Sequence, residues 1–375
     1  MGYTRKMLSG ASSTWLEIDL SAIQGNLRQI QIITRRPVMA VIKANAYGHG
    51  LVEVGRAVAG AGAAWCGVAR FEEGLALRAA GIELPILVMG FSDPQHVPAA
   101  IAHHIRLTVF RPEAAWAYAE QARAVGGRLV VHVKLDTGMG RLGVNAEEGP
   151  HFLQSLVNYP ELHIEGLFTH LALADEPGLP VTAQQLARFS RVLAAVTAAG
   201  LRPALVHAAN SAASLVQPEA WFDLVRPGIA LYGLHPSSQT PLPAGFQAAL
   251  AWKARLVSLK VLPPGHGVSY GFRYVTQGHE RIGTLPVGYA DGLRRQGGNL
   301  ALVGGQVVPV VGTVCMDQCM LQLDHAPLAQ PGDEVVLIGR QGQAALTAEM
   351  LAEAWGTNNY DVVCGLAARL PRFYC

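Results

Sequence analysis

The sequence has few charges, few cysteines and no long apolar run. Only 15% of its 375 residues are charged, and the net charge is +2. This balance offers no basic surface for nucleic acid or for an acidic membrane. No apolar run approaches the roughly 20 residues of a membrane-spanning helix. The N-terminal residues 1–15 lack the apolar segment of a secretory signal, so we predict no export.

The cysteines argue against both a disulfide framework and a zinc site. Their number is odd, and none of them forms a CxxC pair. Cys315 and Cys319 have no matching second pair, so we expect no bound metal. Reduced thiols in a cytoplasmic enzyme fit this pattern best. The five are Cys66, Cys315, Cys319, Cys364 and Cys375.

Short apolar runs alternate with segments of helical period through the first two thirds of the chain. Strands separated by helices predict parallel βαβ units. Eight such runs over about 220 residues predict an α/β fold of the (β/α)8 TIM-barrel type. The alternative is a doubly wound open sheet, which normally has a glycine-rich turn after its first strand; none follows here. The runs are residues 38–42, 65–69, 86–90, 105–110, 128–138, 164–172, 204–211 and 222–233.

The composition and periodicity of the sequence change after a Pro/Ser-rich connector at residues 236–246. The text beyond it is rich in valine and glycine, and helical periods are scarce until about residue 347, which predicts mostly β-structure. We therefore expect a barrel over residues 15–243 and a β-rich C-terminal domain over residues 244–375. Residues 1–14 are expected to form a tail or an early strand.

Polar side chains gather where the predicted strands end. In a TIM barrel the active site lies at the C-terminal ends of the strands, so these side chains should meet at one mouth. They are Lys43, Asn45 and Tyr47 after the first run; Lys134, Asp136 and Arg141 at the fifth; His170 in the sixth; His207, Asn210 and Ser211 in the seventh; and Arg226, Gly228 and Ile229 in the eighth.

Lys43 follows a purely apolar run, which is unusual for a lysine. Burial lowers the pKa of an amine and makes it a nucleophile. Such lysines form imines with carbonyl compounds, including pyridoxal 5′-phosphate (PLP). The alternative is a lysine that extends from a strand end into solvent. The side chain alone does not decide between the two, so the surrounding residues must.

The segment AVIKANAYGHG, residues 40–50, resembles the PLP-lysine signature of alanine racemases, and the resemblance runs from about residue 15 to residue 374. It implies an isomerase that interconverts L- and D-alanine and supplies D-alanine for cell-wall peptidoglycan. It also implies a head-to-tail homodimer with shared active sites. Further matching segments, in order, are KLDTGMGRLG (134–143), HAANSAA (207–213), RPGIALYG (226–233), GVSYG (267–271), LPVGYADG (285–292) and VCMDQ (314–318).

The resemblance assigns two proton carriers. Lys43 is expected to hold PLP as an internal aldimine and to act as the base on one face of the substrate Cα. Tyr270 is expected on the opposite face, entering from the other subunit. A free tyrosine has a pKa of about 10, so it needs neighbours that favour the phenolate. Arg141 and His170 match the family residues placed to do so.

The resemblance also assigns the cofactor contacts. Arg226 resembles the arginine that bonds the pyridine nitrogen. Because arginine only donates, that nitrogen stays unprotonated and the ring becomes a weaker electron sink. Reprotonation at Cα is then favoured over transamination. The expected PLP-binding residues are Lys43, Tyr47, His170, Asn210, Ser211, Arg226, Gly228, Ile229 and Tyr360.

The remaining assignments concern the substrate and a modification. Arg141 is expected to contact the substrate, as are Tyr289 and Met316, both contributed by the other subunit. Lys134 matches a position that is carbamylated in part of the family. A carbamate would replace a cation beside Arg141 by an anion. Plain amine and carbamate both remain open for Lys134.

Two other functions are compatible with a PLP-binding barrel. A non-catalytic PLP-binding protein uses a similar barrel but lacks a second β-domain, so residues 246–375 argue against it. A PLP-dependent decarboxylase shares the two-domain plan but places a carboxylate at the pyridine nitrogen, where Arg226 is expected here. The sequence therefore favours the racemase.

Overall fold

The computed structural model describes residues 12–375, and the chain divides into two units. The barrel unit consists of residues 21–46 and 51–247. The β-rich unit consists of the described residues up to Leu20, residues 47–50 and residues 248–375. Most of the tail expected over residues 1–14 lies outside the described residues.

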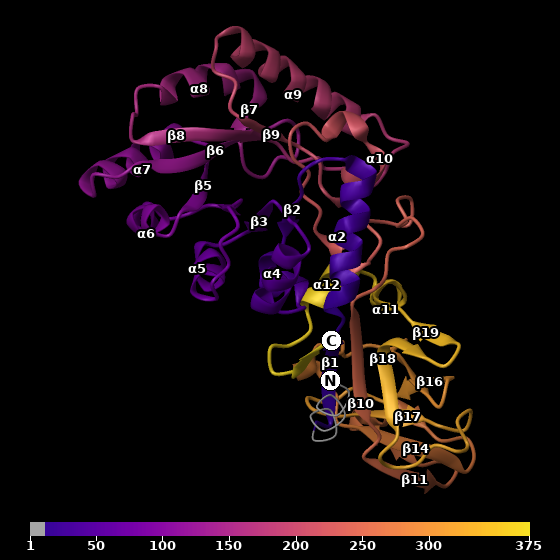
Figure 1. Cartoon of the computed structure of the whole chain (residues 1–375). Helices are drawn as coiled ribbons and strands as arrows, with labels where there is room; N and C mark the ends of the chain where they lie inside the picture. Colours follow the sequence, from indigo (N-terminus) through magenta and orange to yellow (C-terminus); the bar gives the residue numbers. More distant parts are fainter. Residues whose placement is uncertain (1–11) are drawn as a thin grey trace. The chain divides into compact units, whose positions relative to one another are not determined.

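The barrel unit is built on a curled parallel sheet with helices on its outer side (Figure 1). Its strands follow the order β2-β3-β4-β5-β6-β8-β9, with the short β7 beside β6. Seven of the eight predicted runs therefore form strands, and the α/β barrel class is confirmed. The strands are β2 (Met39–Val41), β3 (Trp65–Val68), β4 (Ile86–Val88), β5 (Ile105–Val109), β6 (Leu129–Asp136), β7 (Val144–Asn145), β8 (Leu162–Phe168) and β9 (Leu205–His207).

The eighth predicted strand is reduced to one β-bridge, between Val38 and Val225. Hydrogen bonds still join this segment to a strand on each side. Asp223 N donates to Val206 O in β9 (3.0 Å), and Met39 N in β2 donates to Val225 O (2.8 Å). Pro227 has no N–H with which to extend a ladder, which explains why the segment stays irregular. The segment nevertheless closes the ring of strands.

The helices of the barrel unit cover the sheet with their apolar faces. In α2 the fully buried side chains Ile23, Leu27 and Ile30 recur at helical spacing, as the sequence predicts. These helices are α2 (Leu20–Thr34), α4 (Leu51–Gly60), α5 (Phe71–Ala79), α6 (Val97–Ala102), α7 (Pro112–Ala124), α8 (Gly149–Leu156), α9 (Val181–Ala198) and α10 (Ser211–Val216).

The β-rich unit has one large sheet of order β11-β14-β17-β16-β15-β18-β10-β1-β20, with β19 beside β18. Two short helices, α11 (Ala348–Trp355) and α12 (Asn359–Cys364), precede its last strand. The strands are β1 (Thr14–Ile18), β10 (Leu250–Arg255), β11 (Ser258–Leu262), β14 (Glu280–Leu285), β15 (Leu300–Val303), β16 (Gln306–Val311), β17 (Cys319–Gln322), β18 (Glu334–Gln341), β19 (Ala344–Leu346) and β20 (Arg372–Tyr374); β12 (Gly267–Val268) and β13 (Tyr274–Val275) form a separate pair.

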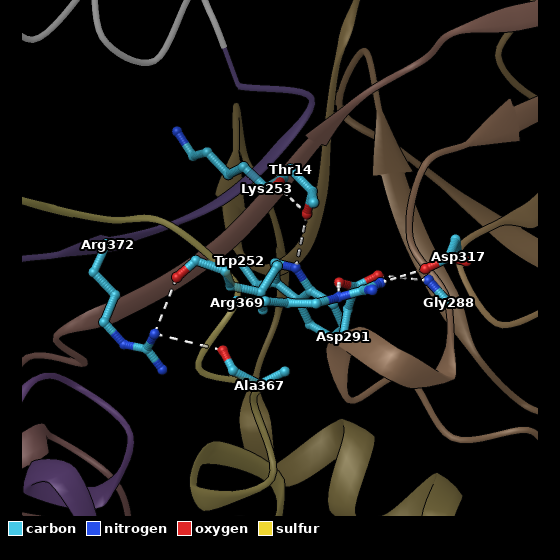
Figure 2. Close-up of polar contacts among 10 residues, drawn as sticks. Thr14, Trp252, Lys253, Gly288, Asp291, Asp317, Ala367, Arg369 and Arg372 are labelled. Carbon is cyan, nitrogen blue, oxygen red and sulfur yellow. Dashed lines mark hydrogen bonds and ion pairs between the residues drawn. The ribbon is translucent and has the colours of Figure 1, made fainter.

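Strand β1 lies in the β-rich unit, although the sequence placed the start of the barrel at residue 15. It pairs antiparallel with β10 and parallel with β20, the last strand of the chain. Trp252 Nε1 donates to Thr14 Oγ1 (3.2 Å), which adds a side-chain contact to this pairing (Figure 2). Pairing between the two ends of a chain leaves no local signal in the sequence, which is why the boundary differs.

Candidate active site

Lys43 follows β2 by one fully buried residue, Ile42, and begins a left-handed turn. Ala44, Asn45 and Ala46 have φ of 54°, 54° and 53°. Consecutive non-glycine residues in this region cost about 1–2 kcal/mol each, so the surroundings must hold the turn. Ala44 N donates to Glu73 Oε1 (2.6 Å), and Leu51 N donates to Asn45 Oδ1 (2.9 Å). The sequence did not reveal this turn.

Positive charge is concentrated at the C-terminal ends of the barrel strands. Lys134, in β6, is 5% exposed. Burial and, to a smaller extent, the nearby cations Arg226, Arg141 and Lys43 together lower the pKa of Lys134 to about 8, against the opposing effect of Asp136. The structure thus brings together the lysines and arginines that the sequence placed at one mouth.

His170 lies two residues beyond the end of β8, among the same cations. Burial lowers the pKa of His170 well below its usual value, and Arg226, Lys134, Arg141 and Lys43 act in the same direction. The imidazole is therefore neutral at physiological pH. It can accept a proton or a hydrogen bond through one ring nitrogen and donate one through the other.

Arg141 is exposed and follows a turn that Asp136 organises. Asp136 ends β6, and its Oδ1 accepts from Gly138 N and Met139 N, both at 2.8 Å. Its Oδ2 accepts from Gly140 N (2.9 Å). The carboxylate thus fixes the backbone that leads from Lys134 to Arg141.

Arg226 is 3% exposed, and its guanidinium group forms several hydrogen bonds with buried groups of the barrel. Its Nη2 donates to Thr169 O (2.8 Å) and Ala208 O (3.1 Å), and its Nη1 donates to His207 Nδ1 (3.0 Å). Burial lowers the pKa of Arg226 to about 9, so it remains a cation at neutral pH. A buried guanidinium that only donates suits an acceptor nitrogen or an anion.

Ser211 and its neighbours form a small polar nest. Ser211 Oγ accepts from Gly228 N (2.8 Å) and from Ala230 N (3.3 Å). Asn210 Oδ1 caps α10 by accepting from Ala213 N (3.1 Å). Ile229 is fully buried. The sequence-predicted residues of the seventh and eighth runs therefore lie together.

In the β-rich unit, Tyr270, Tyr289 and Met316 are exposed by 69%, 43% and 54%. The segment from Thr313 to Met316 links them. Thr313 Oγ1 donates to Tyr270 O (2.8 Å), and Tyr289 N donates to Cys315 O (3.0 Å). The three side chains expected from a second subunit thus share one part of this unit.

An arginine ties two of these loops together (Figure 2). Arg369 Nε donates to Asp291 Oδ1, and its Nη2 donates to Asp317 Oδ1, both at 2.7 Å. Asp291 follows Tyr289 by two residues and Asp317 follows Met316 by one. Asp291 Oδ2 also accepts from Gly288 N (2.9 Å). The sequence did not single out Arg369.

Tyr47 and Tyr360, both expected near the cofactor phosphate, lie in the β-rich unit. Their ring centroids are 6.2 Å apart, with an interplanar angle of 49°. Burial raises the pKa of Tyr47, and Tyr360 and Cys364 raise it further. Its hydroxyl therefore stays protonated and available as a donor.

The buried His132 and the half-buried Glu165, below the mouth, were not predicted from the sequence as functional residues. His132 Nδ1 lies 2.9 Å from His207 Nε2, and His132 Nε2 lies 3.2 Å from Glu165 Oε2. His132 precedes Lys134 by two residues in β6, and alternate residues of a strand share a face. This spacing from Lys134 is the feature of the sequence that could have indicated His132. These features define a barrel enzyme with a lysine and a cluster of cations at the ends of its strands.

Comparisons with known proteins give the family. Residues 18–236 match the family model "Alanine racemase, N-terminal domain", and residues 249–374 match "Alanine racemase, C-terminal domain". The alanine racemase of Symbiobacterium thermophilum is 46% identical over 98% of each chain. That of Desulfovibrio desulfuricans is 44% identical over 98% of this chain and all of its own. A solved alanine racemase of Clostridium difficile 630 superposes with a TM-score of 0.93 at 37% identity, covering 97% of this chain and 96% of its own.

The chain therefore belongs to the alanine racemase family, as its motifs predicted, and is a PLP-dependent isomerase. The charge at its barrel mouth suits this cofactor. Four cations and a neutral imidazole gather at the barrel mouth, where an anionic phosphate would offset their mutual repulsion. Among residues 12–375, no helix is long and apolar enough to cross a membrane.

Proposed function

We propose that this chain interconverts L- and D-alanine with one proton carrier on each face of the substrate Cα. PLP, when bound, withdraws electrons from the substrate and makes the Cα proton acidic. Lys43 is the carrier on one face and Tyr270 the carrier on the other. The observation that carries the proposal is the gathering of Lys43, Lys134, Arg141, His170 and Arg226 at the barrel mouth, matched by an exposed Tyr270 beside Tyr289 and Met316 in the other unit.

The proposal assigns a group of residues to each part of the cofactor. Arg226 would donate to the pyridine nitrogen of PLP without protonating it, which would keep electron withdrawal by the ring moderate and favour return of the proton to Cα. Lys43 attaches the cofactor covalently. His170 and Asn210 position the ring and Arg226. We assign the phosphate to Ser211, to the backbone N–H groups of Gly228 and Ile229, and to the hydroxyls of Tyr47 and Tyr360, each of which would donate to it when PLP binds.

Tyr270 requires a basic neighbourhood in order to accept a proton near neutral pH. Arg141 supplies positive charge that stabilises the phenolate, and neutral His170 supplies a hydrogen bond. Tyr289 and Met316, linked to Tyr270 through the segment from Thr313 to Met316, would limit the space for the substrate side chain. Arg141 contacts the substrate carboxylate, as expected from charge complementarity.

We infer that the enzyme works as a homodimer in which the β-rich unit of one copy completes the barrel mouth of the other. Phe272, beside Tyr270, is also exposed, by 68%, so an aromatic surface is available for a partner. The five cysteines lie outside any disulfide in the described structure, which supports a cytoplasmic location. From this location the enzyme would supply D-alanine for the synthesis of peptidoglycan.

The two-carrier proposal is tested by proton exchange in D2O with Tyr270→Phe. We expect racemisation to fall by about 10²–10⁴-fold, the usual contribution of a general acid or base. Deuterium entry should be slowed far more for one alanine enantiomer than for the other, because Lys43 still serves one face. Tyr159→Phe, a half-buried tyrosine of the barrel unit, is the control. Unimpaired exchange from both enantiomers would remove Tyr270 from the mechanism.

Lys43→Ala tests the attachment of the cofactor separately. We expect the variant to lose PLP during gel filtration and to show no PLP-modified peptide after borohydride reduction, by mass spectrometry. The exposed Lys260→Ala should retain both signals. A reduced PLP adduct on another lysine of the Lys43→Ala protein, together with normal turnover, would contradict the assignment.

A further inference from the structure

We propose that His207, His132 and Glu165 form a proton-ordered chain that positions Arg226 and supports its charge from inside the barrel. The chain runs from the mouth toward the opposite end of the strands, where Arg106 lies near the start of β5. Its links are 3.0 Å from Arg226 Nη1 to His207 Nδ1, 2.9 Å from His207 Nε2 to His132 Nδ1, and 3.2 Å from His132 Nε2 to Glu165 Oε2. The proposal rests on the role of Arg226 in the proposed function.

The direction of every hydrogen bond follows from the first one. A guanidinium only donates, so His207 Nδ1 must accept. A neutral His207 then carries its proton on Nε2 and donates to His132 Nδ1. His132 in turn carries its proton on Nε2 and donates to Glu165. The opposite tautomers would place an N–H of His207 against the N–H of Arg226.

Both imidazoles are held neutral. Burial lowers the pKa of His207 well below its usual value, with Arg226 and His132 acting in the same direction. Burial also lowers the pKa of His132, and this outweighs the attraction of Glu165. A second proton on either ring would break one of the ordered bonds. The chain therefore has one stable arrangement, defined by a donor at one end and an acceptor at the other.

Within the hydrogen-bonded chain of Arg226, His207, His132 and Glu165, the only charged acceptor is Glu165. Burial opposes its ionisation, but hydrogen bonds from His132 and Arg106 lower the pKa of Glu165 to about 2. Arg106 Nε lies 3.1 Å from Glu165 Oε2. Among residues 12–375, no carboxylate contacts Arg226 directly. Linked hydrogen bonds strengthen one another, so the two imidazoles transmit the effect of the Glu165 carboxylate to Arg226. No negative charge is then needed at the barrel mouth itself, which stays cationic.

The strands make room for this chain. The pairing of β6 with β8 shifts register between Val131 and His132. Gly166 lies beside the His132 ring, and a Cβ there would come within 2.2 Å of His132 Nδ1. Phe168 stacks on the His207 ring at 4.8 Å with an interplanar angle of 9°. Bulge, glycine and stacking together fix both rings, so the chain is held rigidly and positions Arg226.

Histidine ¹⁵N NMR on the holoenzyme tests the tautomers without any substitution. We expect His207 and His132 each to show a protonated Nε2 and an unprotonated Nδ1 at pH 7. His207→Asn and His132→Asn serve to assign the signals. A proton on Nδ1 of either ring, or a doubly protonated ring, would overturn the proposal.

Glu165→Gln tests the effect on Arg226, because it retains an acceptor oxygen but removes the charge. We expect kcat to fall about tenfold with KM for alanine little changed, as for the loss of one charge-assisted hydrogen bond. The alkaline limb of the kcat profile should move to lower pH. Glu120→Gln, at a surface ion pair with Arg123, should change neither.

The outcomes separate this proposal from the proposed function. An unchanged kcat and pH profile in Glu165→Gln would overturn the chain while the wild-type enzyme still racemises alanine. A wild-type enzyme without racemase activity would overturn the function, whereas the tautomer pattern would be measured independently of turnover.

Discussion

Lys134 shows, at the scale of one residue, how surroundings change a side chain. It is buried among Arg226, Arg141 and Lys43, and burial with these neighbours lowers the pKa of its amine to about 8. Carbamylation requires the neutral amine, because only the free lone pair attacks carbon dioxide. It would also turn a repelling cation into an attracting anion. A lowered amine pKa and surrounding cations are both conditions under which a lysine carbamate forms, so we propose this modification for Lys134.

We predict that Lys134 takes up ¹³C-labelled carbon dioxide. A carbamate signal in ¹³C NMR should grow as the pH rises through about 8, because the protonated amine that dominates below this pKa cannot react. Lys134→Arg should lose the signal, and Lys260→Arg should keep it. A spectrum without a carbamate between pH 7 and 9 would leave Lys134 as a plain amine.

At the scale of an element, the left-handed turn after β2 decides where Lys43 points. Glu73 holds it, since its carboxylate accepts from Ala44 N (2.6 Å), Ala69 N (2.9 Å) and Arg70 N (3.1 Å). One side chain thus links the ends of β2 and β3 at the barrel mouth. The turn persists because these bonds offset its unfavourable φ angles.

Glu73→Ala should destabilise the protein and disturb the attachment of PLP. Leaving three N–H groups without their charged acceptor is expected to cost about 2–4 kcal/mol of unfolding free energy. Urea denaturation measures the loss, and the rate of PLP capture by the apoenzyme reports on Lys43. Glu72→Ala, whose side chain is 69% exposed, is the neighbouring control. Equal stability of the two variants would show that Glu73 does not hold the turn.

At the scale of the whole molecule, the two proposed proton carriers lie in different units. The barrel unit holds Lys43 in the cluster of cations, and the β-rich unit holds the exposed Tyr270. A symmetric dimer can bring each Tyr270 to the Lys43 of the other copy and close two equal sites.

Mixing two inactive variants tests this arrangement. Lys43→Ala and Tyr270→Phe subunits, dissociated and reassociated in equal amounts, should recover about a quarter of wild-type activity. Half of the dimers are then mixed, and each mixed dimer has one intact site. Either variant treated alone is the control and should stay inactive. No recovery despite mixed dimers, detected by mass-tagged subunits, would place both carriers in one chain.

Much of the fold could be predicted because local patterns encode it. Alternating strand and helix periods predicted the barrel, and seven of eight runs became strands. The eighth remained a bridge at Val225, since Pro227 limits its hydrogen bonding. The pairing of β1 with β20 could not be predicted, because it joins segments more than 350 residues apart along the chain.

The site divides in the same way. The sequence by itself determined the family and the polar residues at strand ends, since motif order and strand polarity suffice to place Lys43, His170 and Arg226 at one mouth. Only the tertiary structure decided the left-handed turn held by Glu73 and the ordered chain from Arg226 to Glu165. Both depend on contacts between strands that are distant in sequence, and hydrogen-bond direction is defined only when donor and acceptor face each other.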